Sequence, residues 1–222
     1  MGADRVIGGA DGHTPSGFIP ADVVVIDGRV DGLVSRGATV ADAETVYGDG
    51  CWLTPGFIDL HAHSALRSFD EPQMAAKVSQ GFTTQLICPD GLGPAPVDDA
   101  HVAARRDYLA GLEPSSLVAW SWRSFDQYLS VLDASAPATD LISCVPHSAI
   151  RQVVMGDGDR DATGEELRQM QALTDASLAA GGAAVSFGMI YAPGMYGRGR
   201  ELRALASVAA KYGVPLVPHV RN

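Results

Sequence analysis

The feature that most constrains the fold is an alternation of strand-like and helix-like segments that begins at Pro55 and continues along the rest of the chain. The strand-like segments are short, apolar and rich in β-branched residues, which favours strands. Strands that alternate with helices predict βα units around a parallel sheet. Six strands are expected, at 56–60, 82–87, 117–120, 141–145, 183–187 and 214–217.

The clearest helix is expected over 164–180. Thr163 and Glu166 have the spacing of a capping box, which satisfies the free N–H groups at a helix start. The apolar residues Leu167, Met170, Leu173 and Leu178 fall on one stripe of that helix. Further helices are expected from about Pro72 to Gly81 and over 98–111, 124–132 and 200–212.

Residues 1–54 have a different pattern of short strands and turns, such as the Asp27-Gly28 hairpin turn. About fifty residues of hairpin cannot bury a core alone. We therefore expect two domains: 1–54 as part of a small β-sandwich, and 55–222 as the α/β domain.

Length bears on the type of sheet. A complete (β/α)₈ barrel takes roughly 200–250 residues or more. The 167 residues that follow the first 55 of the 222 suffice for about five βα units of ~30 residues each. The domain is either a smaller open sheet or a barrel cut short, and we expect a partial (β/α)₈ barrel because the chain ends just past a strand.

His61 and His63 are the strongest chemical signal. Residues i and i+2 of a strand point to the same face, roughly 6.6 Å apart, so two imidazoles can meet at one ion such as Zn²⁺. They end the first α/β strand, where barrel enzymes place their chemistry. His219 is delivered in the same way by the last strand. Each histidine would also fit an ordinary strand end, without any metal.

Other candidates follow the remaining strands. Asp90 or Cys88 could bridge two cations, although Asp90 also fits a turn and Cys88 a small buried hydrophobe. Arg151 could pair with a substrate carboxylate, or lie on the surface. His147 and Tyr191 could line the same rim, or simply pack.

Composition and charge argue against several classes of protein. The net charge of −10 and the lack of a basic cluster argue against nucleic-acid binding. No run approaches eighteen apolar residues, so no membrane span is expected. Three scattered cysteines and an N-terminus without a signal-peptide pattern favour a reducing compartment, the cytoplasm.

PGFIDLHAHS, residues 55–64, resembles the metal-binding opening of the amidohydrolase superfamily. Other stretches resemble its N-acyl-D-amino-acid deacylase (D-aminoacylase) branch, and together they cover nearly the whole chain. They are SQGFTTQLICPDGLGPAPV (79–97), SFDQYL (124–129), PHSAIRQVVMGDGDRDAT (146–163), SFGMIYAPG (186–194) and VPLVPHVRN (214–222).

The resemblance implies a (β/α)₈ barrel, a β-sandwich built from both chain ends, and one or two divalent ions, normally Zn²⁺. His61 and His63 match the first-strand ligands, and His219 matches a fifth-strand histidine. The bridging position is cysteine in some members, but the alignment from Thr83 places Asp90 there, with Cys88 as the alternative. The implied substrate is a small N-acyl amino acid.

Several departures accompany the resemblance. The family's sixth-strand histidine and catalytic aspartate would lie beyond Asn222, so the 222-residue chain alone is expected to be inactive. Ala65 stands where this branch often has an acidic residue. The strand count places His219 after a sixth strand, so 117–120 is expected to be an extra strand outside the barrel.

The function implied is metal-dependent hydrolysis of a linear carbon–nitrogen amide bond, from N-acyl-D-amino acid to D-amino acid and carboxylate. One alternative is a cyclic-amide hydrolase of the dihydroorotase or hydantoinase type, which would need a bridging lysine that no strand end supplies. Another is a non-catalytic remnant or binding module on the same scaffold.

Overall fold

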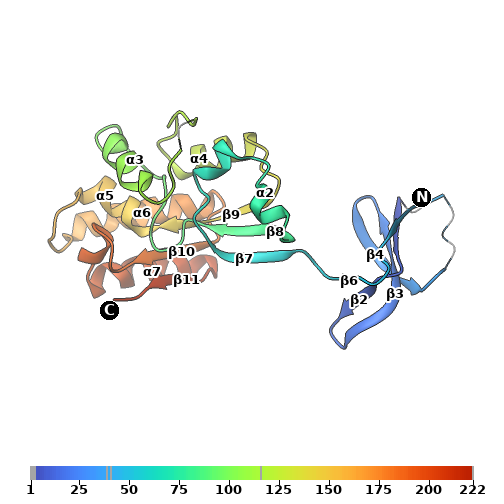
Figure 1. Cartoon of the computed structure of the whole chain (residues 1–222). Helices are drawn as coiled ribbons and strands as arrows, with labels where there is room; N and C mark the ends of the chain where they lie inside the picture. Colours follow the sequence, from blue (N-terminus) through green and yellow to red (C-terminus); the bar gives the residue numbers. More distant parts are fainter. Residues whose placement is uncertain (1–3, 39, 41, 116, 222) are drawn as a thin grey trace. The chain divides into compact units, whose positions relative to one another are not determined.

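The computed structural model describes residues 4–38, 40, 42–115 and 117–221. It divides into two compact units, Met1–Gly56 and Phe57–Asn222 (Figure 1). No helix in the described ranges is both long enough and apolar enough to cross a membrane.

The first unit is a small sheet centred on one long strand, β3. This strand pairs antiparallel with three others, and its Val23 and Val24 are buried. Asp27 and Gly28 both have positive φ, 49° and 71°, as the expected hairpin turn between β3 and β4 requires. The strands are β1 (Arg5–Gly8), β2 (Asp11–Thr14), β3 (Gly17–Ile26), β4 (Arg29–Ser35), β5 (Glu44–Tyr47) and β6 (Trp52–Leu53).

The second unit contains a five-stranded sheet in which neighbouring strands are parallel and follow one another in chain order (Figure 1). This order places the carboxyl ends of the strands along one rim. The expectation of a mixed α/β fold is confirmed. The strands are β7 (Phe57–Ala62), β8 (Phe82–Ile87), β9 (Asp140–Pro146), β10 (Ala184–Gly188) and β11 (Leu216–His219).

Helices join these strands and pack on the sheet: α6 contacts β9, and α5 and α7 contact β10. Two of the helices begin with capping boxes, Ser124 with Gln127 and Thr163 with Glu166. The helices are α1 (Arg67–Asp70), α2 (Ala75–Val78), α3 (Val102–Ala110), α4 (Phe125–Ala134), α5 (His147–Met155), α6 (Gly164–Ala179) and α7 (Gly199–Tyr212), with a 3₁₀ turn η1 (Gly194–Tyr196).

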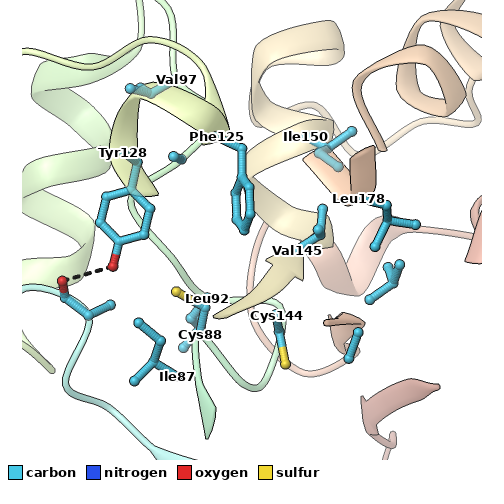
Figure 2. Packing of buried hydrophobic residues seen from close by; sticks show 14 of the residues in the cluster. Ile87, Cys88, Leu92, Val97, Phe125, Tyr128, Cys144, Val145, Ile150 and Leu178 are labelled. Atoms are coloured by element: carbon cyan, nitrogen blue, oxygen red, sulfur yellow. Dashed lines mark hydrogen bonds between the residues drawn. The ribbon is translucent and has the colours of Figure 1, made fainter. Parts of the chain in front are cut away.

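The core of this unit lies between the sheet and its helices. Figure 2 shows Val145 of β9, Phe125 of α4 and Ile150 of α5 within it. Tyr128 is fully buried, and its hydroxyl donates to the carbonyl of Ala65 at 2.9 Å. The core therefore extends to the backbone that follows the paired histidines.

The expectation of a strand at 117–120 is wrong. Val118 and Trp120 are buried in the core, but the segment 117–120 joins no sheet. Its apolar residues are explained by burial without strand pairing. As a consequence His219 ends the fifth parallel strand, the place that the family resemblance gives it.

Two helix expectations need correction. The helix expected from about Pro72 to Gly81 is instead the single turn α2, because Met74 directly before it takes a left-handed conformation with φ 45°. The helix expected from Asp98 begins at Val102, after a turn in which the Asp98 carboxylate accepts the N–H of His101 at 2.8 Å. Helix α5 was not expected.

Candidate metal centre

Four candidate ligands come from the carboxyl ends of three parallel strands. His61 lies in β7, and His63 directly follows that strand. Asp90 follows β8 after a short turn, and His219 is the last residue of β11. Parallel strands present their carboxyl ends at one rim, so residues distant in the sequence meet there.

The three imidazoles meet at the carboxylate of Asp90. The Nε2 atoms of His61 and His63 lie 3.2 and 3.4 Å from its Oδ2. The Nδ1 atom of His219 lies 3.3 Å from its other oxygen, Oδ1. Both oxygens therefore face imidazole nitrogens: Oδ2 faces those of His61 and His63, and Oδ1 faces that of His219.

This donor set fits a divalent cation. One ligand atom from each of His61, His63 and Asp90 lies within 4.8 Å of the others. Burial lowers the pKa of His63, although the negative charge of Asp90 acts in the opposite direction. The neutral imidazole favoured by burial is the form that binds metal. Imidazole and carboxylate together suit zinc and its neighbours.

The backbone at Asp90 is held in an unusual conformation. Cys88 and Asp90 both have φ 57°, a left-handed geometry that costs a non-glycine residue about 1–3 kcal/mol and persists where the surroundings enforce it. Ser186 supplies part of that enforcement, since its hydroxyl donates to the Cys88 carbonyl at 2.7 Å and accepts the Gly91 N–H at 3.2 Å. Gly188 supplies more: a Cβ there would overlap the carbonyl oxygen of Asp90.

Cys88 lies away from the cluster of imidazoles. Its side chain is buried in the core, where Figure 2 shows it near Leu92, Ile87 and Tyr128. Burial raises the pKa of the Cys88 thiol well above its ordinary value. Since the thiolate is the form that binds metal, this environment disfavours Cys88 as the bridging ligand.

We expect Cys88→Ala to leave zinc affinity unchanged, because the thiol makes its contacts in the core. The substitution should cost about 1 kcal/mol of stability, as an ordinary small cavity does. Titration of the folded variant with Zn²⁺ checks this. Loss of zinc binding without loss of folded structure would make Cys88 the bridge.

His147 and Arg151 make their contacts elsewhere. Both are fully buried in α5 and share one partner in α7, Glu201. His147 Nε2 lies 2.6 Å from Glu201 Oε1, and the Arg151 guanidinium donates to Glu201 Oε2. Tyr191, by contrast, lies beside the cluster, with its ring edge-on to His219 at a centroid distance of 5.2 Å.

Sequence reasoning missed Glu113. Its carboxyl oxygen Oε2 accepts the N–H of Leu66 at 2.7 Å, and the neighbouring N–H groups of Ala65 and Arg67 also act to lower its pKa. Burial raises the pKa of Glu113 to about 7, against the opposing effect of these backbone donors. No sequence signal links Glu113 to a segment 47 residues earlier.

Glu113 should make stability depend on pH. With its pKa raised from 4.5 to about 7, the folded protein keeps a proton that the unfolded chain releases, so stability falls as pH rises through this window. Relative to Glu113→Gln, the wild-type free energy of unfolding should fall by up to about 3 kcal/mol between pH 5 and pH 8. Urea unfolding of both proteins with chelator present measures this, and a difference independent of pH would contradict it.

Comparisons with known proteins agree with this arrangement. A model described as amidohydrolase family matches residues 44–213. The chain is 32% identical over 204 residues to an N-acyl-D-glutamate deacylase of Alcaligenes xylosoxydans xylosoxydans, covering 91% of this chain and 40% of that protein. It is 35% identical to an N-acyl-D-aspartate deacylase of the same organism, with 86% and 38% covered.

Solved structures give the same result. The N-acyl-D-glutamate deacylase of Bordetella bronchiseptica, complexed with zinc and a phosphonate mimic of the tetrahedral intermediate, superimposes with a TM-score of 0.84 at 30% identity. A D-aminoacylase with a binuclear metal centre gives 0.85 at 29% identity. The matches cover 100% and 96% of this chain but 46% and 44% of those proteins, so the chain spans less than half of each.

Proposed function

Because this chain belongs to the amidohydrolase family, we propose that the protein carrying it hydrolyses a linear amide, releasing a D-amino acid and a carboxylate from an N-acyl-D-amino acid. The observation that carries the proposal is the meeting of three imidazoles from β7 and β11 at the carboxylate of Asp90. The similarity to deacylases of N-acyl-D-glutamate and N-acyl-D-aspartate supports this choice of substrate class.

The residues that would hold zinc divide into two groups around one bridge. His61, His63 and one oxygen of Asp90 would hold the first ion, and His219 with the other oxygen would contribute to a second. A bound zinc ion supplies Lewis acidity, which polarises an amide carbonyl and lowers the pKa of water toward ~7. Asp90 would link the two sets of ligands, since its Oδ2 faces His61 and His63 and its Oδ1 faces His219.

The remaining roles in the reaction fall to other side chains. Tyr191 lies against His219, where it can line the substrate pocket. His147 and Arg151, held by Glu201, lie in α5, which contacts the η1 turn after Tyr191 and would support the pocket there. Because Asp90 is engaged by the three imidazoles, another carboxylate would transfer the proton to the leaving amine, as the family resemblance implies.

On this proposal residues 55–222 form about the first five βα units of a (β/α)₈ barrel, and 1–54 contribute to a small β-sandwich. The chain-order arrangement of parallel strands supports the barrel. Exposed apolar residues on the first and last of these strands, Ile58, Leu60 and Leu216, also support further elements that cover the faces of the sheet there. A cytoplasmic location is part of the same proposal.

The test is an amide-hydrolysis assay of the protein that carries this chain, loaded with zinc. N-acetyl-D-glutamate, N-acetyl-D-aspartate and N-acetyl-D-leucine are offered beside their L-enantiomers and hydantoin. We expect carboxylate release from at least one D-substrate and none from residues 1–222 alone. Turnover of hydantoin only would indicate a cyclic-amide hydrolase, and a protein that neither binds zinc nor turns over any substrate would be a remnant.

A further inference from the structure

Helix α3 contains a fully buried arginine that reaches the loop carrying Asp90. The Nε atom of Arg105 donates to the carbonyl of Gly93 at 2.8 Å, three residues beyond Asp90. Its Nη2 atom donates to the hydroxyl of Ser148 at 3.0 Å, and that hydroxyl donates in turn to the carbonyl of Gly91. Arg105 thus holds the Asp90 loop directly and through Ser148.

The Asp90 loop depends on such donors because it is buried. Residues 88–97 are all buried, whereas loops normally run over the surface, where water satisfies their backbone. Protein side chains replace that water: Trp122 Nε1 donates to the Pro94 carbonyl at 2.9 Å, and Ser186 engages both Cys88 and Gly91. Arg105 is the charged member of this set.

The residue Glu113 performs the equivalent task for the segment after His63. It is joined to α3 by its own N–H, which donates to the Leu109 carbonyl at 2.8 Å. Its carboxyl oxygen Oε2 accepts the N–H of Leu66 at 2.7 Å, three residues after His63. The neighbouring N–H groups of Ala65 and Arg67 also favour the ionised form of Glu113.

Neither Arg105 nor Glu113 has an oppositely charged group within ion-pair distance among the described residues. A buried charge is costly unless hydrogen bonds compensate for it. The compensating bonds of Arg105 and Glu113 go to two backbone segments, and each segment carries a candidate metal ligand. If Arg105 and Glu113 served only to fill space in the core, apolar side chains could do so without the cost of burying polar groups.

We propose that Arg105 and Glu113 are positioning residues for the metal centre. They hold the backbone of the Asp90 loop and of the segment after His63, so that Asp90 and His63 can bind the same cation. The inference rests on the proposed metal site and deepens it. Helix α3 thereby couples the two ligand-bearing loops, since one residue of the pair lies within the helix and the other is bonded to its last turn.

The experiment compares metal binding by variants of the protein that carries this chain. Arg105→Met removes the guanidinium, Glu113→Gln removes the ionisable carboxyl group, and Arg105→Lys keeps the positive charge on a single nitrogen. The exposed neighbours Arg106→Met and Asp107→Asn are matched controls. Zn²⁺ affinity is measured by chelator competition, the geometry of the site by the visible spectrum of bound Co²⁺, and folding by circular dichroism.

We expect Arg105→Met and Glu113→Gln to weaken Zn²⁺ binding about tenfold or more, as loss of outer-shell partners does, and to change the Co²⁺ spectrum while the fold is kept. Arg105→Lys should recover part of the affinity, and both controls should match the wild type. Variants that bind both metals like the wild type, or that lose binding only in proportion to unfolding, would overturn the inference and leave the proposed function intact. A wild-type protein that binds no zinc would overturn both.

Discussion

In the protein that carries this chain, replacing Asp90 with asparagine is expected to abolish zinc binding and, with it, the deacylase activity proposed above. The substitution keeps the size of the side chain but removes its negative charge and one acceptor oxygen. Both oxygens of Asp90 face imidazole nitrogens at 3.2–3.4 Å, so every candidate ligand depends on it. The loss of affinity should exceed the roughly 10–100-fold that follows removal of an outer-shell partner.

The control for this experiment is Asp99→Asn. The Asp99 side chain is 90% exposed and pairs with Arg123, so its charge should have no effect on the metal. Zinc content by mass spectrometry of the folded proteins and turnover of N-acetyl-D-glutamate are the two measurements. An Asp90→Asn variant with the zinc content of the wild type would exclude Asp90 as a ligand.

Replacing Glu201 with glutamine is expected to destabilise the protein by about 3–5 kcal/mol, because it leaves a buried charge without its partner. The carboxylate contacts both His147 and Arg151, and those two side chains are fully buried. Burial acts to raise the pKa of Glu201, but the hydrogen bond and charge of His147, together with Arg151, outweigh it and the pKa is lowered. Glu201 therefore stabilises the fold above its ordinary pKa and loses that effect as the pH falls.

Glu165→Gln on the neighbouring helix is the matched control. Glu165 pairs with Arg168, but both side chains are more than 60% exposed. Exposed ion pairs contribute about 0–1 kcal/mol, so this substitution should leave the free energy of unfolding almost unchanged. Urea unfolding of both variants distinguishes the two cases. A Glu201→Gln variant as stable as the control would mean that the carbonyls of Gly158 and Arg160, which also accept hydrogen bonds from Arg151, compensate its charge.

Local patterns predicted a large part of the α/β unit. The strand at 82–87 and the capping box of Thr163 with Glu166 lie where the sequence places them, because β-branched content and cap spacing act over a few residues. His61 and His63 reach the same partner because side chains two residues apart in a strand point to the same face. Asp90 lies near both because the parallel strands β7 and β8 end at the same rim of the sheet.

Long-range partners could not be predicted in this way. Arg151 is paired by Glu201, fifty residues later, and the segment after His63 is held by Glu113. The buried segment 117–120 has strand-like composition, but tertiary packing leaves it outside every sheet. In each case the deciding interaction joins residues that no local periodicity connects.

The most direct measurement is anomalous diffraction at the zinc absorption edge from crystals of the zinc-loaded protein. We expect a peak at about 2.0–2.2 Å from the Nε2 atoms of His61 and His63 and from an oxygen of Asp90. A second peak near His219 would indicate two ions. A map without a peak at Asp90, or with zinc bound elsewhere while these imidazoles stay free, would contradict a metal centre at this rim.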